Sequence, residues 1–141
     1  MMNDLITAWY QLLNGNVTYS SAVVPVYLED APADETSHYI LLTAEGLTDD
    51  SDNSQFRYAA TVVVDVVTVH KSNVRRSIAD DISLQIHNLV FPVKNVSALP
   101  VQAGIQVLNV KQDTSTYLYE DDGVSKYYRH VIRFTQTIIK Q

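Results

Sequence analysis

Histidine is the residue type in this sequence best suited to metal binding or proton transfer near neutral pH, and there are four of them. His38, His70, His87 and His130 are scattered along the chain and match no H-E-x-x-H or related ligand spacing. His70 and His130 fall in two predicted strands and could be neighbours in a sheet, but two histidines without a third ligand make a weak zinc site. We therefore interpret them as polar strand residues and expect no cofactor.

An acidic run within residues 49–53 suggests calcium binding at first sight. Counting a calcium loop from Asp50 places Gln55 at the sixth position and Thr61 at the twelfth, where an EF-hand requires Gly and Glu. The EF-hand pattern therefore fails. We expect residues 45–54 to form a solvent-exposed acidic loop that includes Asp49, Asp50 and Asp52.

A second acidic run could supply paired carboxylates for acid–base catalysis. Glu120, Asp121 and Asp122 adjoin Gly123 in a predicted turn, and nothing nearby forms an apolar pocket that would raise a carboxyl pKa. The sequence also contains no G-x-S-x-G, Walker or G-x-G-x-x-G motif, and four glycines in all leave little for a phosphate-binding loop. These observations predict that the protein is not an enzyme.

Arg75 and Arg76 form the only adjacent pair of basic residues in a chain of net charge −6, which argues against nucleic-acid recognition. They fall in the first turn of a predicted helix, where the positive end of the helix dipole disfavours cations. Two interpretations stay open: the arginines are simply solvated, or they contact an acidic surface of a neighbouring subunit.

Tyrosines, and one acid within an apolar strand, point to protein contacts. Nine tyrosines is a high count for 141 residues, and several cluster around one segment. Tyrosine suits interfaces because it offers contact area at little cost in side-chain entropy. Asp65 interrupts a run of valines, so its carboxylate should face solvent, a lumen or a pairing group. The clustered tyrosines are Tyr117, Tyr119, Tyr127 and Tyr128.

Hydrophobic periodicity predicts the elements that position these residues. Residues 4–13 and 73–90 have apolar side chains at helical spacing, and residues 56–70 alternate as a long central strand. Residues 23–28, with Pro25, resemble an edge strand. Residues 38–43, 104–110 and 127–139 are the remaining predicted strands, and residues 113–125 are predicted to leave the sheet as a polar loop. The order predicts one α+β domain over residues 1–141, with a single mixed or antiparallel sheet of four or five strands and two helices packed on one face.

Composition and charge set further bounds. The chain has no cysteine, which excludes disulfides and suits a reducing compartment, and no apolar stretch has membrane-spanning length. Residues 1–70 contain ten acids and one base, whereas residues 71–141 contain nine bases and six acids. This uneven distribution of charge would allow the acidic surface of one copy to pair with the basic surface of the next. Acidic loops in the first half of the chain would explain the distribution equally well.

Taken together, these segments resemble the tail-terminator (tail-completion) proteins of long-tailed phages over nearly the whole chain. The resemblance rests on the N-terminal amphipathic helix, the strand at residues 39–42 after a proline-containing loop, the long strand at residues 57–66, the helix around residues 78–82 and the closing strand at residues 128–134. Related small α+β proteins also serve as neck rings between portal and tail.

The resemblance implies a virion protein, assembled in the host cytoplasm, that forms a homo-oligomeric ring in the tail or neck. A hexamer is favoured, with a dodecamer as the alternative. The ring would contact the tail tube and head-connector proteins, meet DNA only as the passing genome and involve no membrane. Candidate interface residues are Arg75, Arg76, Tyr117, Tyr119, Tyr127, Asp121 and Asp122, and candidate lumen residues are Asp49, Asp50 and Asp52. The alternative function is a small-ligand-binding or regulatory α+β module.

Overall fold

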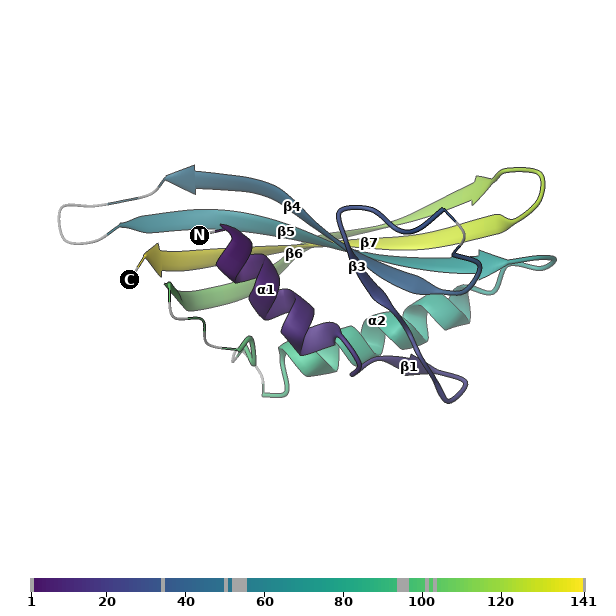
Figure 1. The fold of residues 1–141 in the computed structure, drawn as a ribbon, viewed down its shortest axis with the longest axis horizontal. Coiled ribbons are helices and arrows are strands. Elements are labelled where there is room, and N and C mark those ends of the chain that lie inside the picture. The colour runs from purple at the N-terminus through teal and green to yellow at the C-terminus, as the bar shows by residue number, and fades with distance from the viewer. Residues whose placement is uncertain are drawn as a thin grey trace.

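The computed structural model describes residues 2–33, 35–49, 51, 56–93, 97–100, 102 and 104–140. Within these residues, two helices and seven strands follow one another. Figure 1 shows their arrangement. In order they are α1 (Met2–Leu13), β1 (Thr18–Tyr19), β2 (Ala22–Val23), β3 (Val26–Leu28), β4 (Tyr39–Asp49), β5 (Arg57–His70), α2 (Arg76–Val90), β6 (Ile105–Asp121) and β7 (Lys126–Lys140). In the part of the chain that the structure describes, neither helix has the length and apolar character that spanning a membrane requires.

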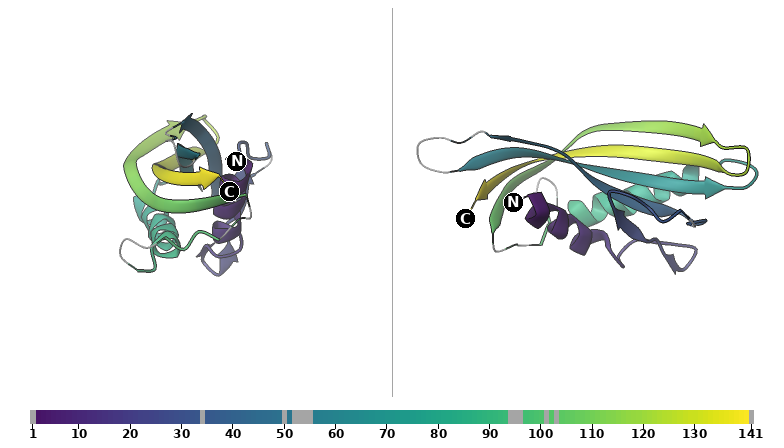
Figure 2. Two further views of the ribbon diagram at one scale, coloured as in Figure 1. Left: turned by 90° about the vertical axis from the view of Figure 1, so that its left-hand side faces the viewer. Right: turned by 45° about the horizontal axis from the view of Figure 1, so that its top comes forward.

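A five-stranded mixed sheet forms the main layer, in the order β3-β4-β5-β7-β6. β3 pairs with β4 in parallel, and the other neighbours are antiparallel. β1 and β2 form a separate two-stranded ribbon. Both helices cover the same face of the long, twisted sheet, as the views in Figures 1 and 2 show. The predicted α+β class is thereby confirmed.

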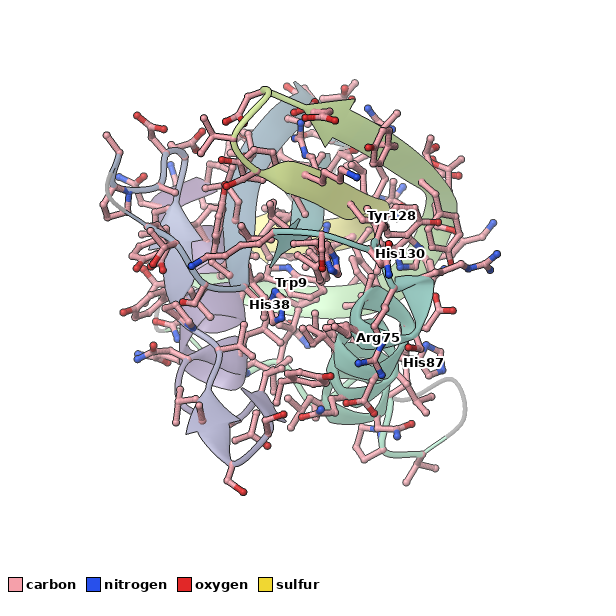
Figure 3. All side chains as sticks on the ribbon, turned by 90° about the vertical axis from the view of Figure 1, so that its right-hand side faces the viewer. Trp9, His38, Arg75, His87, Tyr128 and His130 are labelled. Atoms are coloured by element: carbon pink, nitrogen blue, oxygen red, sulfur yellow. The ribbon has the colours of Figure 1, made fainter. Side chains whose placement is uncertain are left out.

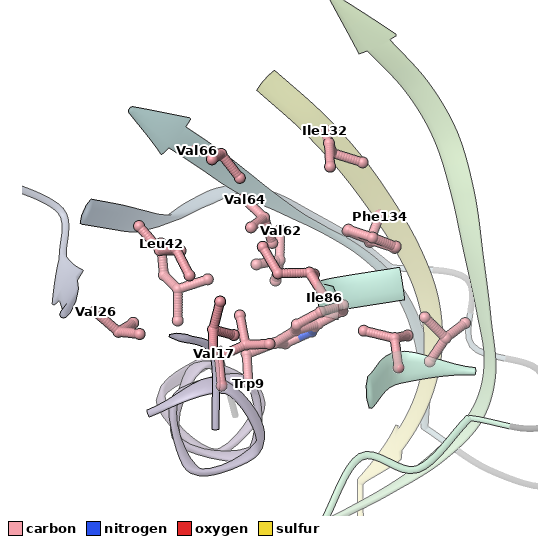
Figure 4. Packing of buried hydrophobic residues seen from close by; sticks show 14 of the residues in the cluster. Trp9, Val17, Val26, Leu42, Val62, Val64, Val66, Ile86, Ile132 and Phe134 are labelled. Atoms are coloured by element: carbon pink, nitrogen blue, oxygen red, sulfur yellow. The ribbon is translucent and has the colours of Figure 1, made fainter. Parts of the chain in front are cut away.

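The core lies between this sheet face and the two helices (Figure 4). Even-numbered residues of β5 point into it, because side chains alternate along a strand, and β-branched valines pack well on a pleated surface. Trp9 of α1 lies under the sheet with its ring centre 4.8 Å from that of Phe134 on β7. Its indole N–H donates to the buried Gln136 Oε1 at 2.6 Å, so the polar tip of the tryptophan is satisfied.

The edge strand predicted at residues 23–28 is confirmed for residues 26–28 only, which follow Pro25. Val23 belongs to β2, and Val26 begins β3 at the edge of the sheet. The carbonyl of Pro25 accepts the N–H of Ile40 at 2.9 Å, so proline still contributes to the pairing although it has no N–H to donate.

The loops predicted at residues 45–54 and 113–125 are wrong, because the described residues of both segments are largely strand. β4 continues through residues 45–49, and β6 continues from residue 105 to residue 121. Both extensions have exposed side chains on both faces, so no alternation of apolar and polar residues marks them in the sequence. Backbone pairing with β5 and β7 forms them instead. The second helix begins at Arg76, three residues later than predicted.

Candidate interaction surfaces

Arg76 finds partners within its own chain. Its Nε lies 3.2 Å from Asp80 Oδ2, and its guanidinium stands 4.5 Å from the centre of the Tyr117 ring. Tyr117 Oη donates a hydrogen bond to Asp80 Oδ1 at 3.0 Å. Contact with the Tyr117 hydroxyl and the charge of Asp80 raise the pKa of Arg76. An i,i+4 acid and an aromatic ring therefore offset the unfavourable placement of a cation in the first helical turn.

Arg75 remains available for contacts outside the chain. It sits at the N-cap of α2 with extended backbone (φ −122°), and its side chain makes no capping hydrogen bond. No ion pair joins Arg75 to another described residue. Figure 3 shows it at the end of α2 nearest the viewer, below Tyr128 and His130 of β7.

Tyr117 also covers a buried histidine. The rings of Tyr117 and His130 stack with centres 4.2 Å apart and an angle of 8° between planes. His130 Nδ1 lies 2.6 Å from Ser83 Oγ on α2, whereas its buried Nε2 has no hydrogen-bond partner among the described residues. Burial lowers the pKa of His130, with a smaller opposing effect from the charge of Asp80. These contacts anchor the outer half of β6 to β7 and α2.

Asp65 pairs with Arg129 on the helix-free face of the sheet, as the interrupted valine run predicted it would pair or face water. Its side chain is only 5% exposed. Arg129 Nε lies 3.1 Å from Asp65 Oδ2, and its Nη2 contacts the same oxygen. Arg129 Nη1 reaches Glu120 Oε1 at 2.9 Å. The hydrogen bond with Asp65 is the main reason that the pKa of Arg129 is raised.

A pocket of about 300 Å³ lies beside this ion pair. Arg129, Glu120 and Tyr127 line one side, and the segment that follows β3 lines the other. Glu35 in that segment bonds the Tyr27 hydroxyl and Ser37. Since Arg129 is already paired with two carboxylates, the described lining of the pocket offers no free positive charge to an anionic ligand.

Asp121 and Asp122 build the turn between β6 and β7. Asp121 Oδ1 accepts the N–H of Gly123 at 2.9 Å. Asp122 Oδ1 accepts the N–H groups of Val124 and Ser125, at 2.9 and 2.7 Å, and these hydrogen bonds lower the pKa of Asp122. Gly123 has φ +86°, which glycine adopts without strain. Both aspartates thus shape the turn, and any interface role they have is additional.

Tyr119 and Asp49 are the most exposed of the remaining predicted contacts. Tyr119 is 54% exposed and stands opposite Tyr128 across the β6–β7 pair. Asp49 ends β4, and its carboxylate accepts hydrogen bonds from the Ser51 hydroxyl and N–H, which lower its pKa. Asp50 and Asp52, the other predicted lumen residues, lie outside the described residues.

His70 and His130 lie on the neighbouring strands β5 and β7 but not opposite each other. His70 pairs with Lys126 and His130 with Val66, because the two histidines sit four rungs apart along the same strand pair. His70 instead lies near His38, with ring centres 5.9 Å apart, and His38 Nδ1 accepts the N–H of Val69 at 3.0 Å. Within the described part of the chain, no group of three or more His, Asp or Glu side chains is placed to hold a metal ion.

Sequence reasoning did not single out Arg129, Asp80 or Ser83. Their partners lie 64, 37 and 47 residues away, respectively. One signal was present for Arg129. It alternates along its strand with residues that face the core, so its side chain had to lie on the other face of the sheet, which is also the face of Asp65. The register that sets them side by side was not readable from the sequence.

No family model matches this sequence, and none of the curated proteins matches it. Among solved structures, a chain of the virion of a native gene transfer agent particle superimposes with a TM-score of 0.71. The match covers 99% of this chain and 97% of that chain, at 16% sequence identity. This likeness shows that the two chains share their fold over essentially their whole length.

Proposed function

We propose that this protein is a structural component of a phage-like virion that forms a ring at the head–tail junction, as a tail terminator or neck ring. The ring would cap the tail and join it to the head connector. The observation that carries this proposal is the fold shared with a chain of a gene transfer agent virion, which spans almost all of both chains. A likeness of that extent involves a complete domain and is not limited to a widespread motif.

Ring closure requires a heterologous interface, in which one surface meets a different surface of the next copy. The uneven charge of the two halves of the chain supports such an interface. Two of the predicted contacts have exposed side chains that could meet a neighbouring copy: Arg75, which has no ion pair among the described residues, and Tyr119 on β6. A hexamer remains our expectation for the ring.

We place the acidic end of β4 toward the lumen, where negative charge would repel passing DNA and let the genome slide. Asp49 and the neighbouring acids of residues 45–54 supply this charge. Reversing these acids should retard genome passage without preventing assembly. Normal passage in the charge-reversed variant would refute the lumen placement.

A small-ligand-binding module is the second candidate, and the pocket beside Arg129 is the observation that favours it. Its lining is polar but its arginine is already paired, which argues for a structural ion pair rather than a ligand anchor. A thermal-shift screen against metabolites distinguishes the two functions. A hit that is abolished by Tyr127→Ala and retained in Tyr119→Ala would favour the ligand-binding module.

Negative-stain electron microscopy with mass photometry, over a series of protein concentrations, tests the ring directly. We expect rings with a central hole and a mass that is a fixed multiple of the subunit mass. Because some ring subunits assemble only on a tail, the same protein should also be added to particles produced without it. A protein that forms no ring in solution and does not restore head–tail joining would contradict the proposal.

A further inference from the structure

β6 presents a long edge with no strand partner on its outer side among the described residues. Every side chain in residues 111–121 is exposed, and residues 114–121 pair with β7 in unbroken register. Natural edge strands are protected by proline, lysine, bulges or a covering element. Residues 114–121 contain no proline, lysine or bulge, and Thr, Tyr and Leu dominate them. Such an edge is suited to pairing with a strand of another chain.

The opposite edge of the sheet is also incompletely covered. β3 pairs with only three residues of β4, Ile40 to Leu42. Beyond them the outer side of β4 has no strand partner in the described part of the chain. In the end-on view of Figure 2, β4 (dark blue) and β6 (green) lie toward opposite edges of the sheet.

Exposed apolar side chains concentrate on these two edges. Of eleven large apolar side chains that are exposed among the described residues, four lie on β6 and two on β3 or β4. Covering apolar area is favourable, and exposed apolar patches mark interaction sites. The six residues are Leu108, Tyr117, Leu118 and Tyr119 on the first edge and Leu28 and Leu47 on the second.

Strand direction decides how two copies can meet. β3 runs parallel to β4, and each further step across the sheet reverses direction, so β6 runs opposite to both β3 and β4. A copy rotated about an axis along the strands therefore presents its β3–β4 edge antiparallel to β6. Following the register across the sheet places Leu28 level with Ser115. The two apolar edges thus fall at matching heights.

We propose that β6 of one copy pairs in antiparallel fashion with the β3–β4 edge of the next copy, so that one continuous sheet runs around the ring. This inference rests on the proposed ring and names its subunit interface. Pairing β6 with β6 of a second copy would leave the β3–β4 edge exposed and would close as a dimer. The heterologous pairing covers both apolar edges and leaves no free edge after closure.

Hydrogen exchange in rings and in dissociated subunits provides the first test. Alternate amides of β6 point outward, so about half of those in residues 114–121 should exchange at least about tenfold more slowly in the ring. Amides of β7 at residues 127–133 are the internal control, because β7 is already paired on both sides. Rings in which β6 exchanges as fast as in the subunit would overturn this inference while leaving the ring itself established.

Disulfide trapping provides the second test, since the chain has no cysteine of its own. Leu28→Cys is combined in turn with a cysteine at each position from 114 to 119, which allows for stagger between copies. We expect at least one combination to give a ladder of covalent oligomers on oxidation, and the β6 cysteines alone to give none. Leu84→Cys, exposed on α2, replaces Leu28→Cys as the control.

The outcomes separate the two proposals. Rings without a ladder in any combination, or dimers from the single β6 cysteines, refute the edge pairing alone. Absence of rings both in solution and on particles refutes the proposed function and the edge pairing with it.

Discussion

Replacing Arg129 with methionine removes the partner of a buried carboxylate. Asp65 is 5% exposed at its side chain, and its described polar contacts are with Arg129. Breaking a buried ion pair by removing one partner costs about 3–5 kcal/mol, because the remaining charge is left without solvent or a counter-ion. The Arg129 side chain is 28% exposed, so water can partly replace it. We therefore expect a loss of about 3 kcal/mol, at the lower end of that range.

Urea unfolding of Arg129→Met against the natural protein measures this loss. With a slope of about 1.5 kcal/mol per M, the unfolding midpoint should fall by about 2 M. Glu120→Gln is the matched control, since it removes only the exposed arm of the network, and should cost less than about 1 kcal/mol.

The double variant Asp65→Val with Arg129→Met separates a lost charge partner from a general defect in packing. Replacing both members of an ion pair with apolar residues is often neutral or stabilising, so the double variant should lie within about 1 kcal/mol of the natural protein. A single variant that loses less than about 1 kcal/mol would refute this reasoning. A double variant as unstable as the single one would also refute it.

Two further predictions concern the β6–β7 hairpin. Burial holds the pKa of His130 below its ordinary value of 6.5, so the stability it contributes is complete above pH 6.5 and is lost as pH falls through its lower folded value. His130→Gln should therefore reduce the loss of unfolding free energy between about pH 7 and pH 5, measured by urea titration, and an unchanged loss would assign it to other groups. Gly123→Ala meets no neighbouring atom but must adopt φ +86°, so it should cost about 1 kcal/mol. Gly46→Ala, also in open space but without positive φ, should not destabilise the protein, and equal losses in the two variants would contradict the conformational explanation.

Local sequence patterns were sufficient to predict the elements that face the core of the molecule. The valine alternation of β5 and the apolar stripes of both helices follow from side-chain periodicity, which each element displays by itself. The same patterns predicted that Asp65 would pair or face water. They also placed Tyr117 and Tyr119 near residues 127 and 128, although in a loop rather than on paired strands.

Apolar periodicity was sufficient to predict the class of fold, the order of the main elements and the buried face of β5, because it records which side of each element avoids water. It could not predict that residues 113–121 are strand, that Asp65 meets Arg129, or that Arg76, Asp80 and Tyr117 form one cluster. These features depend on register between strands and helices far apart in the chain. Backbone pairing sets that register, and backbone groups are the same for every residue except proline.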